Sequence, residues 1–412
     1  MKAGVGFSNS MDFFSSGKEI AEKALKNGNI MRPDFVFSFC GGNVDCDAIF
    51  HGIQSVVGDT VNIVGGSAIG VLTHDHLSYE NYPAGCAVLQ SDSLQCNVSV
   101  ASDINKNEKL AGNNLVKKMS LEADEESPLI LFYDSIKKTP TEKTPPVMNA
   151  SSPLIEGIEE EYKSDIPIVG AGLIGDYSFN PVNLFCGSYV SSQSVVGSIL
   201  KGNFKTYYKI MHGLTPLNGV YHTITGIEGS TIYEVDGKPI VKMIDDLYGS
   251  KEWQNQNPVQ LVSLGVNYGE KYVKPEESNY VNRLITGVLP EGKGVCLFEP
   301  DLHMGAEIQF MLRDTGEMIR STKNNSLELM NQIESDGRKA VWGLYIDCAG
   351  RTANVSNTST EEASEVQKVF NQNGIPLLGF YSGVEIAPFL GKSRGLDWTG
   401  VLVVMAEGQK DA

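Results

Sequence analysis

The sequence lacks the features that mark membrane and secreted proteins. No stretch reaches 18 apolar residues, about the length that a helix needs to span a bilayer. The first residues, Met-Lys-Ala-Gly-Val-Gly-Phe-Ser, contain no apolar run of the kind found in signal peptides. The 7 cysteines are odd in number and show no C-x-x-C spacing, a pattern typical of reduced, buried thiols. We therefore expect a cytoplasmic protein without membrane insertion.

Basic residues are also scarce, and they are dispersed. Lys and Arg total 33 against 50 Asp and Glu, so the formal net charge is −17, and no block of five basic residues occurs. A surface of this kind repels the phosphate backbone of nucleic acids. Direct binding of nucleic acid is therefore not expected.

Apolar residues and glycine, in contrast, are plentiful, and they form a repeat. Hydrophobic residues make up 41% of the 412 residues, and 43 residues are Gly. Three short apolar runs that contain Gly match one another, and each follows an amphipathic helical pattern and an earlier apolar run. The matching runs are residues 61–66, 166–172 and 375–380, and the earlier runs are residues 35–40, 129–134 and 341–348.

The repeat predicts three strand–helix–strand units. A single helix that covers the connection places the two strands parallel, with a right-handed crossover. We therefore expect an α/β fold with mixed, largely parallel sheets built from these units. Two units precede residue 205 and one follows it, which predicts two similar-sized halves, residues 1–205 and 206–412. Ser151-Ser152 before Pro153 predicts the start of the second helix.

Polar and Gly-rich segments follow the first strand of each unit. They begin at Cys40, at Asp134 and at Asp347. In parallel α/β sheets, ligands gather beyond the carboxyl ends of the strands. We therefore expect the binding site at this edge of the sheets.

An ordered set of motifs resembles the FIST family. The N-terminal FIST half is suggested by residues 3–8, 63–67 and 169–172, and the C-terminal half by residues 233–239, 347–351 and 379–388. The resemblance implies a FIST N-terminal-like domain in residues 1–205 and a FIST C-terminal-like domain in residues 206–412. It also implies a ligand-sensing module in signal transduction, with amino acids or similar small metabolites as ligands. Many relatives are fused to output domains, and this chain has no length left for one. The resemblance therefore implies a small-molecule ligand and a separate signalling protein as the expected partners.

Arg351 and Glu385 are the strongest ligand-binding candidates. The Arg351 guanidinium can fork onto a ligand carboxylate, and Glu385 with Tyr381 and Ser382 can hold an ammonium group. The structural alternatives are a salt bridge that holds the loop, for Arg351, and hydrogen bonds within the loop, for the other three.

Cysteines and glycines at the same edge are further candidates. Cys348 and Cys40 are nucleophiles if a base lowers their pKa, and small buried wall residues otherwise. Gly41, Gly65 and Gly66 can expose backbone N–H groups to an anion, or simply form tight turns.

The histidines supply no convincing metal site, and no cofactor is expected. Haem is an alternative, because the family resemblance includes haem sensing, and His51, His212 and His222 are each conceivable axial ligands. The leading prediction is a cytoplasmic small-molecule-binding sensor. The alternatives are a haem-binding gas sensor and an enzyme that uses Cys348.

Overall fold

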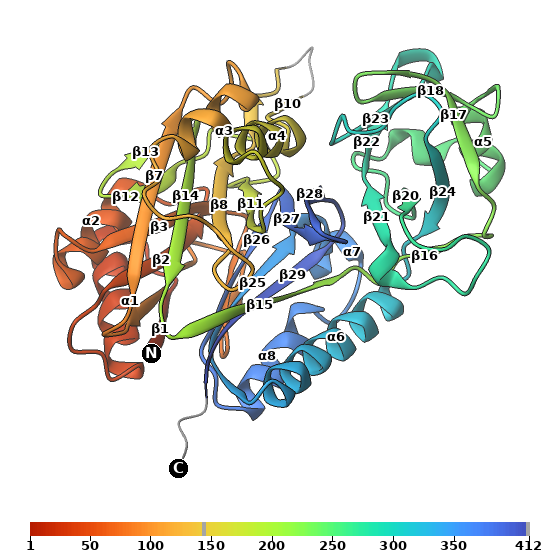
Figure 1. The fold of residues 1–412 in the computed structure, drawn as a ribbon. Helices are drawn as coiled ribbons and strands as arrows, with labels where there is room; N and C mark the ends of the chain where they lie inside the picture. The colour runs from red at the N-terminus through yellow and green to blue at the C-terminus, as the bar shows by residue number, and fades with distance from the viewer. Residues whose placement is uncertain (142–145, 409–412) are drawn as a thin grey trace.

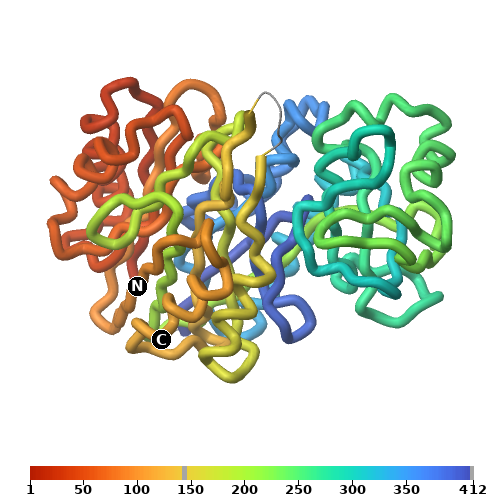
Figure 2. Tube along the Cα trace, turned by 90° about the horizontal axis from the view of Figure 1, so that it is seen from above, coloured from red at the N-terminus to blue at the C-terminus, as the bar shows by residue number. Residues whose placement is uncertain are grey.

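The computed structural model describes residues 1–141 and 146–408. In it, three six-stranded sheets form one body, and a small antiparallel barrel lies beside that body (Figure 1). Seen from above, the barrel occupies one side of the molecule and the N-terminal helices the other (Figure 2).

The body repeats one order of elements three times: strand, helix, strand, helix, strand, hairpin, strand. The first repeat contains β1 (Lys2–Ser8), α1 (Phe13–Asn27), β2 (Phe35–Gly41), α2 (Cys46–Val57), β3 (Asn62–Ala68), β4 (Val71–Thr73), β5 (Leu77–Ser78) and β6 (Ala84–Gln90). The second contains β7 (Gln95–Ser102), α3 (Glu108–Val116), β8 (Leu129–Asp134), α4 (Ser151–Tyr162), β11 (Ile168–Leu173), β12 (Leu184–Gly187), β13 (Val190–Ser191) and β14 (Ser194–Lys201). The third contains β15 (Phe204–Met211), α6 (Thr315–Ser335), β25 (Arg338–Cys348), α8 (Ala363–Gln372), β26 (Leu377–Ser382), β27 (Val384–Phe389), β28 (Lys392–Leu396) and β29 (Gly400–Gly408).

Short additional elements interrupt two of the repeats. A two-stranded ribbon precedes α4, and one helical turn precedes α8. These elements are β9 (Ile136–Lys138), β10 (Val147–Met148) and α7 (Ala353–Ser356).

Each repeat gives its hairpin to the sheet of another repeat. The sheets run β1-β6-β2-β3-β12-β13, β7-β14-β8-β11-β27-β28 and β15-β29-β25-β26-β4-β5. Hairpin β4–β5 of the first repeat thus completes the third sheet, β12–β13 of the second completes the first, and β27–β28 of the third completes the second. The exchange is cyclic, so the three sheets interlock.

The three predicted strand–helix–strand units are present, but the expected sheet type is wrong. The pairs β2–β3, β8–β11 and β25–β26 are parallel, and the other strand pairs among the described residues are antiparallel. The sheets are therefore mixed and mostly antiparallel, not largely parallel. They also do not separate into two halves, because the exchanged hairpins tie early and late segments together.

The main core lies between the three sheets. Phe39, Phe132 and Phe380, one from each sheet, meet there: the Phe39 and Phe380 rings stack with centroids 3.7 Å apart, and Phe132 packs edge-on against both. On their outer faces, the sheets are covered by the helix pairs α1–α2, α3–α4 and α6–α8 (Figure 1). A whole strand such as β2 is therefore buried on both faces.

The small barrel is inserted into the third repeat, between β15 and α6. Its strands form an antiparallel sheet in the order β21-β20-β24-β17-β18-β23-β22, and β21 and β22 at its two ends are separated by Leu284 alone. The sheet therefore nearly closes on a core of its own. Its elements are β16 (Thr215–Pro216), β17 (His222–Glu228), β18 (Thr231–Val235), β19 (Lys238–Pro239), α5 (Ile240–Tyr248), β20 (Val262–Asn267), β21 (Tyr280–Arg283), β22 (Ile285–Val288), β23 (Val295–Leu297) and β24 (Glu307–Leu312).

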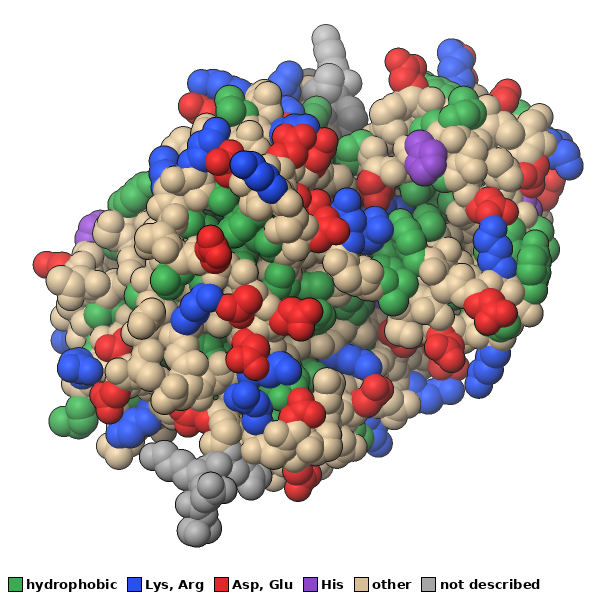
Figure 3. Space-filling view, viewed as in Figure 1, with side chains coloured by type: hydrophobic (Ala, Val, Ile, Leu, Met, Phe, Trp, Pro, Cys, Tyr) green, Lys and Arg blue, Asp and Glu red, His purple; other side chains and the backbone are tan. Residues whose placement is uncertain are grey.

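The surface mixes charges of both signs. On the face seen in Figure 3, Lys and Arg side chains are interspersed with Asp and Glu. No helix within residues 1–141 and 146–408 is long and apolar enough to cross a membrane.

Candidate functional site

Five of the residues predicted for the site lie together where β25 and β26 end. In the parallel register, Cys348 lies opposite Ser382, and Tyr381 opposite Asp347. Arg351 follows β25 in a turn of 3-10 helix, and Glu385 follows β26 in β27. All five side chains are buried. The carboxyl ends of the two strands thus position one polar cluster inside the protein.

Arg351 is the hub of a buried ion-pair network. Its guanidinium donates to Glu362, and its Nε lies 3.1 Å from Asp347 Oδ1. Nη1 donates to the backbone oxygens of His212 (3.0 Å) and Trp398 (2.8 Å). These partners all belong to the protein, which favours the salt-bridge alternative for Arg351. A role in ligand binding stays a prediction.

Tyrosine hydroxyls connect this network to the region before α8. Tyr345 donates to Glu362, while Tyr381 donates to Glu361 Oε2 at 3.0 Å. Tyr79, which follows β5, donates to Glu361 Oε1 at 2.7 Å. Glu361 and Glu362, which precede α8, therefore accept hydrogen bonds from tyrosines of two different repeats.

Glu385 and Asp397 form a second part of the cluster, in which the described residues form no ion pair. Ser382 Oγ donates to Glu385 Oε1 at 2.8 Å, and the Thr399 N–H lies 3.3 Å from Oε2. The Leu284 N–H donates to Asp397 Oδ2 at 2.8 Å, whereas Oδ1 is buried and makes no hydrogen bond to the described residues. Burial raises the pKa of Glu385 well above its usual range and that of Asp397 to about 7.

Two hydroxyl groups at the end of β8 lie near these carboxyl groups. Tyr133 Oη and Ser135 Oγ lie side by side next to Gly172, and neither has another hydrogen-bond partner among the described residues. Burial raises the pKa of the Tyr133 phenol, and the charges of Glu299, Asp397 and Glu385 raise it further. Buried polar atoms without partners are rare in native proteins, and water, an ion or a ligand commonly satisfies them.

The inserted barrel packs against the same region. Arg283 at the end of β21 pairs with Asp301 and donates to the Gly395 oxygen at 3.1 Å. Glu299 accepts from the N–H and hydroxyl of Ser151 (3.0 and 2.8 Å) and of Ser152 (3.2 and 2.7 Å). The barrel therefore caps the start of α4, where four N–H groups otherwise lack partners.

Two of the N-terminal candidates, Gly65 and Gly66, lie inside a sheet. They pair with β2 on one side and β12 on the other. A Cβ on Gly65 would lie 2.0 Å from the Ser38 oxygen. Their position therefore favours close strand packing over an anion site.

Gly41 and Cys40, the other two N-terminal candidates, lie at the carboxyl end of β2. The Gly41 N–H donates to Pro83 O at 2.8 Å. Cys40 is buried, with its Sγ 3.5 Å from Cys46 Sγ. The structure brings Cys40 together with Cys46, a residue that the sequence did not single out.

The three histidines considered as haem ligands each have partners within the protein. His212 is buried, with Nε2 3.0 Å from the Glu277 oxygen and Nδ1 accepting from the Leu214 N–H. His51 Nδ1 lies 2.7 Å from the Asp47 oxygen, and His222 Nδ1 lies 2.7 Å from Asp236 Oδ2. In the described parts of the chain, no three His, Cys, Asp or Glu side chains are grouped so that they could hold a metal ion.

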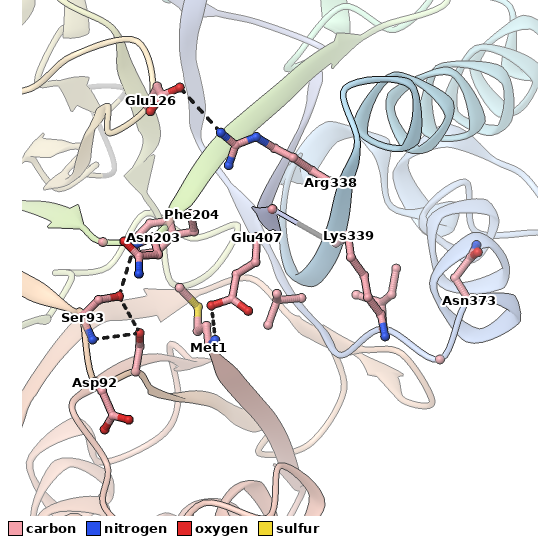
Figure 4. A pocket seen from close by; sticks show the side chains of 17 residues that line it. Met1, Asp92, Ser93, Glu126, Asn203, Phe204, Arg338, Lys339, Asn373 and Glu407 are labelled. Carbon is pink, nitrogen blue, oxygen red and sulfur yellow. Dashed lines mark hydrogen bonds and ion pairs between the residues drawn. The ribbon is translucent and has the colours of Figure 1, made fainter. Parts of the chain in front are cut away.

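A cavity of about 1240 Å³ lies at the opposite end of β25. Figure 4 shows Met1 paired with Glu407, and Arg338 directed at Glu126, 3.8 Å away. β25 begins at this cavity with Arg338 and ends at the polar cluster with Cys348. The cavity and the cluster are therefore separate sites.

Two family models match most of the chain. The FIST N domain matches residues 34–238, and the FIST C domain matches residues 242–388. An uncharacterized protein of Mycobacterium bovis is 26% identical over 255 residues, which cover 60% of this chain and 63% of the relative. An uncharacterized protein of Mycobacterium tuberculosis matches at the same identity, over 60% of this chain and 64% of its own length. This chain thus spans less than two thirds of the length of these curated relatives.

Solved structures with a similar outline are distant. A cyanuric acid hydrolase is 9% identical, with 99% of each chain covered and a TM-score of 0.35. The cyanuric acid hydrolase from A. caulinodans has the same identity and coverage and a TM-score of 0.33. Scores this low support no conclusion about this chain.

Proposed function

This chain belongs to the FIST family, and we propose that it is a small-molecule sensor whose ligand presents a protonated nitrogen to Glu385 and Asp397. Amino acids and similar small amines fit this description. The proposed site is the polar cluster where the ends of β8, β26 and β28 meet the inserted barrel.

The observation that carries the proposal is a pair of buried carboxyl groups that form no ion pair within the described residues. Burial raises the pKa of both groups, and the more distant charges of Arg351, for Glu385, and Arg283, for Asp397, do not offset it. Neither Glu385 nor Asp397 forms an ion pair with a described side chain, whereas Asp347 has Arg351 beside it. A buried carboxylate without a counter-charge is strongly disfavoured, and its pKa rises accordingly. A ligand ammonium group supplies the missing charge and three hydrogen-bond donors.

The neighbouring hydroxyl groups extend the site. Tyr133 and Ser135 each have donor and acceptor capacity that the described residues leave unused. A polar group on the ligand, such as a carboxylate or carbonyl, accepts from these hydroxyls. In this arrangement, the carboxyl groups bind one end of the ligand and the hydroxyl groups bind the other. Arg351 is not needed for either end, and its guanidinium contacts groups of the protein itself.

The inserted barrel offers a route from the ligand to a partner. The Leu284 N–H, between β21 and β22, donates to Asp397, and Arg283 holds the neighbouring Gly395. Binding at Asp397 therefore changes contacts that position the barrel. In this proposal, a separate signalling protein binds the barrel, and this binding depends on the position of the barrel.

Catalysis by Cys348 has less support. Burial raises the pKa of the Cys348 thiol well above its usual range, and the nearby charge of Glu385 adds to this effect. A thiol that stays protonated is a poor nucleophile. Binding is therefore the better supported function of the cluster.

The test is a panel of amino acids and amines, screened by thermal shift and then measured by calorimetry. A hydrogen bond to a charged group contributes about 1.5–3 kcal/mol, so Asp397→Asn and Glu385→Gln should each weaken binding by about tenfold to a hundredfold. Glu159→Gln is the matched control, since burial also raises the pKa of Glu159 but this residue lies on α4, outside the cluster. N-acetylation of the ligand should abolish binding. Unchanged affinity in both cluster variants contradicts the proposal.

A further inference from the structure

Two cysteines of the first repeat lie within reach of each other. Cys40 is near the end of β2, and Cys46 is the first residue of α2. Their Sγ atoms are 3.5 Å apart, and the five-residue segment 41–45 joins them. All seven cysteines are free thiols in this structure.

Cys46 occupies a position that favours its thiolate form. The Cys40 thiol contacts its sulfur, and the Ser67 hydroxyl lies 3.4 Å away. The contact with Cys40 and then the hydrogen bond from Ser67 lower the pKa of Cys46, although burial and the charge of Asp45 oppose them. The positive end of the α2 dipole acts in the same direction. Cys186 shows the contrast, since burial alone raises its pKa to about 12.

The segment that covers the pair is exposed. Cys40 and Cys46 are buried, but Gly42, Asn43 and Asp45 between them face solvent. The exposed residues therefore lie within six positions of both sulfur atoms along the chain. A thiolate and a second thiol that lie within contact of each other have the arrangement of a redox-active dithiol.

We propose that Cys40 and Cys46 form a disulfide when the protein meets a hydroperoxide. The Cys46 thiolate attacks one peroxide oxygen, the O–O bond breaks, and Cys46 becomes a sulfenic acid while an alcohol or water leaves. The Cys40 sulfur then gives up its proton and attacks the Cys46 sulfur, the S–O bond breaks, and water leaves. In total, two thiols lose two electrons and two protons, and the peroxide is reduced to an alcohol or water plus one water.

The bond would form beside a contact between two repeats. It would join the end of β2 covalently to the start of α2. The segment between them includes Gly42, whose N–H donates to the Gly175 oxygen of the second repeat at 3.1 Å. In this proposal, oxidation therefore acts on the region where the first and second repeats meet, and it does so independently of the proposed ligand site.

The test uses the full chain and hydrogen peroxide as the probe. The number of free thiols, counted after denaturation, should fall from 7 by two. A non-reduced digest should yield a peptide in which Cys40 and Cys46 are cross-linked. Cys46→Ser should abolish the loss, and the matched variant Cys86→Ser should retain it. Cross-linking between other cysteines, or a loss of two thiols that persists in Cys46→Ser, overturns the proposal.

A second measurement needs no variant. Native protein treated with iodoacetamide should be alkylated at Cys46 well before Cys86, whose pKa is raised by burial. Equal or slower alkylation of Cys46 contradicts its role as the attacking thiolate.

Discussion

Replacing Asp397 by Asn should change how the stability of the protein depends on pH. Burial raises the pKa of Asp397 to about 7 in the folded protein, from 3.8 in the unfolded chain. Because the folded value is higher, the stabilising contribution of this group is complete below about pH 4 and is lost as the pH rises through 7. Between these two pKa values, each rise of one pH unit lowers the free energy of unfolding of the wild type by about 1.4 kcal/mol. The neutral amide in the variant does not titrate and keeps an oxygen that can accept from the Leu284 N–H.

The quantity to measure is the difference in free energy of unfolding between Asp397→Asn and the wild type. Between pH 5 and pH 8, the free energy of unfolding of the variant should rise by about 2.5 kcal/mol relative to the wild type. Urea unfolding followed by tryptophan fluorescence measures it. Asp12→Asn is the control, because the Ser15 N–H lowers the pKa of Asp12 and its titration ends below pH 5. A difference that stays constant within about 1 kcal/mol for Asp397→Asn would refute the burial argument.

Two further substitutions test the internal packing. Arg351→Ala leaves two buried carboxyl groups without their cation, so urea unfolding should show a loss of about 3–5 kcal/mol, and a variant of near wild-type stability contradicts the hub role. Gly65→Ala should lower the melting temperature strongly, because φ is +141° and the new Cβ would lie 2.0 Å from a backbone oxygen of β2. Gly287→Ala, with open space around its Cβ position, should change the unfolding free energy by about 0.5 kcal/mol or less.

The repeat could be predicted from the sequence because each unit is local. Strand, helix and strand follow one another within about forty residues in the first two units, and the apolar runs with Gly mark the second strand. The sheet type could not be predicted in the same way. The hairpins that follow β3, β11 and β26 pair with sheets of other repeats. The sequence of each hairpin contains no signal that identifies its partner strand, which lies far away along the chain. Strands such as β14, buried on both faces, also lack the alternation that marks antiparallel pairing.

The candidate site was predicted in part for the same reason. Cys348, Arg351 and Tyr381 follow the two strands of one unit, so local reasoning places them at one edge. Asp397 was missed because it comes from the end of β28, which joins the second sheet rather than the third. A usable signal was the pair Asp397 and Thr399 directly before the apolar run of residues 401–406.

The N-terminal cap of α4 also could not be predicted from local sequence. The sequence predicted a serine hydroxyl that caps the helix ahead of Pro153. The helix α4 is present, but it begins at Ser151, so both serines lie inside it, and the N-cap residue Ala150 forms no side-chain hydrogen bond. The group that caps it is Glu299, 148 residues away in the barrel. A local pattern predicted that a helix begins in this region, but the partner that satisfies its N–H groups depends on the tertiary fold.

The inserted barrel distinguishes the third repeat from the other two. In the first two repeats, the connection from the first strand to the first helix is short, at residues 9–12 and 103–107. In the third repeat, the same connection holds the whole barrel, residues 212–314. The barrel therefore leaves and rejoins the body at the carboxyl end of β15, the end at which it can reach β25 and β26. Its residues Arg283, Leu284 and Glu299 then contact Gly395, Asp397 and Ser151 of the body. The pseudo-symmetric body therefore differs at one place because one of three equivalent connections is extended, and the groups that the extension contacts there include Asp397 of the proposed ligand site.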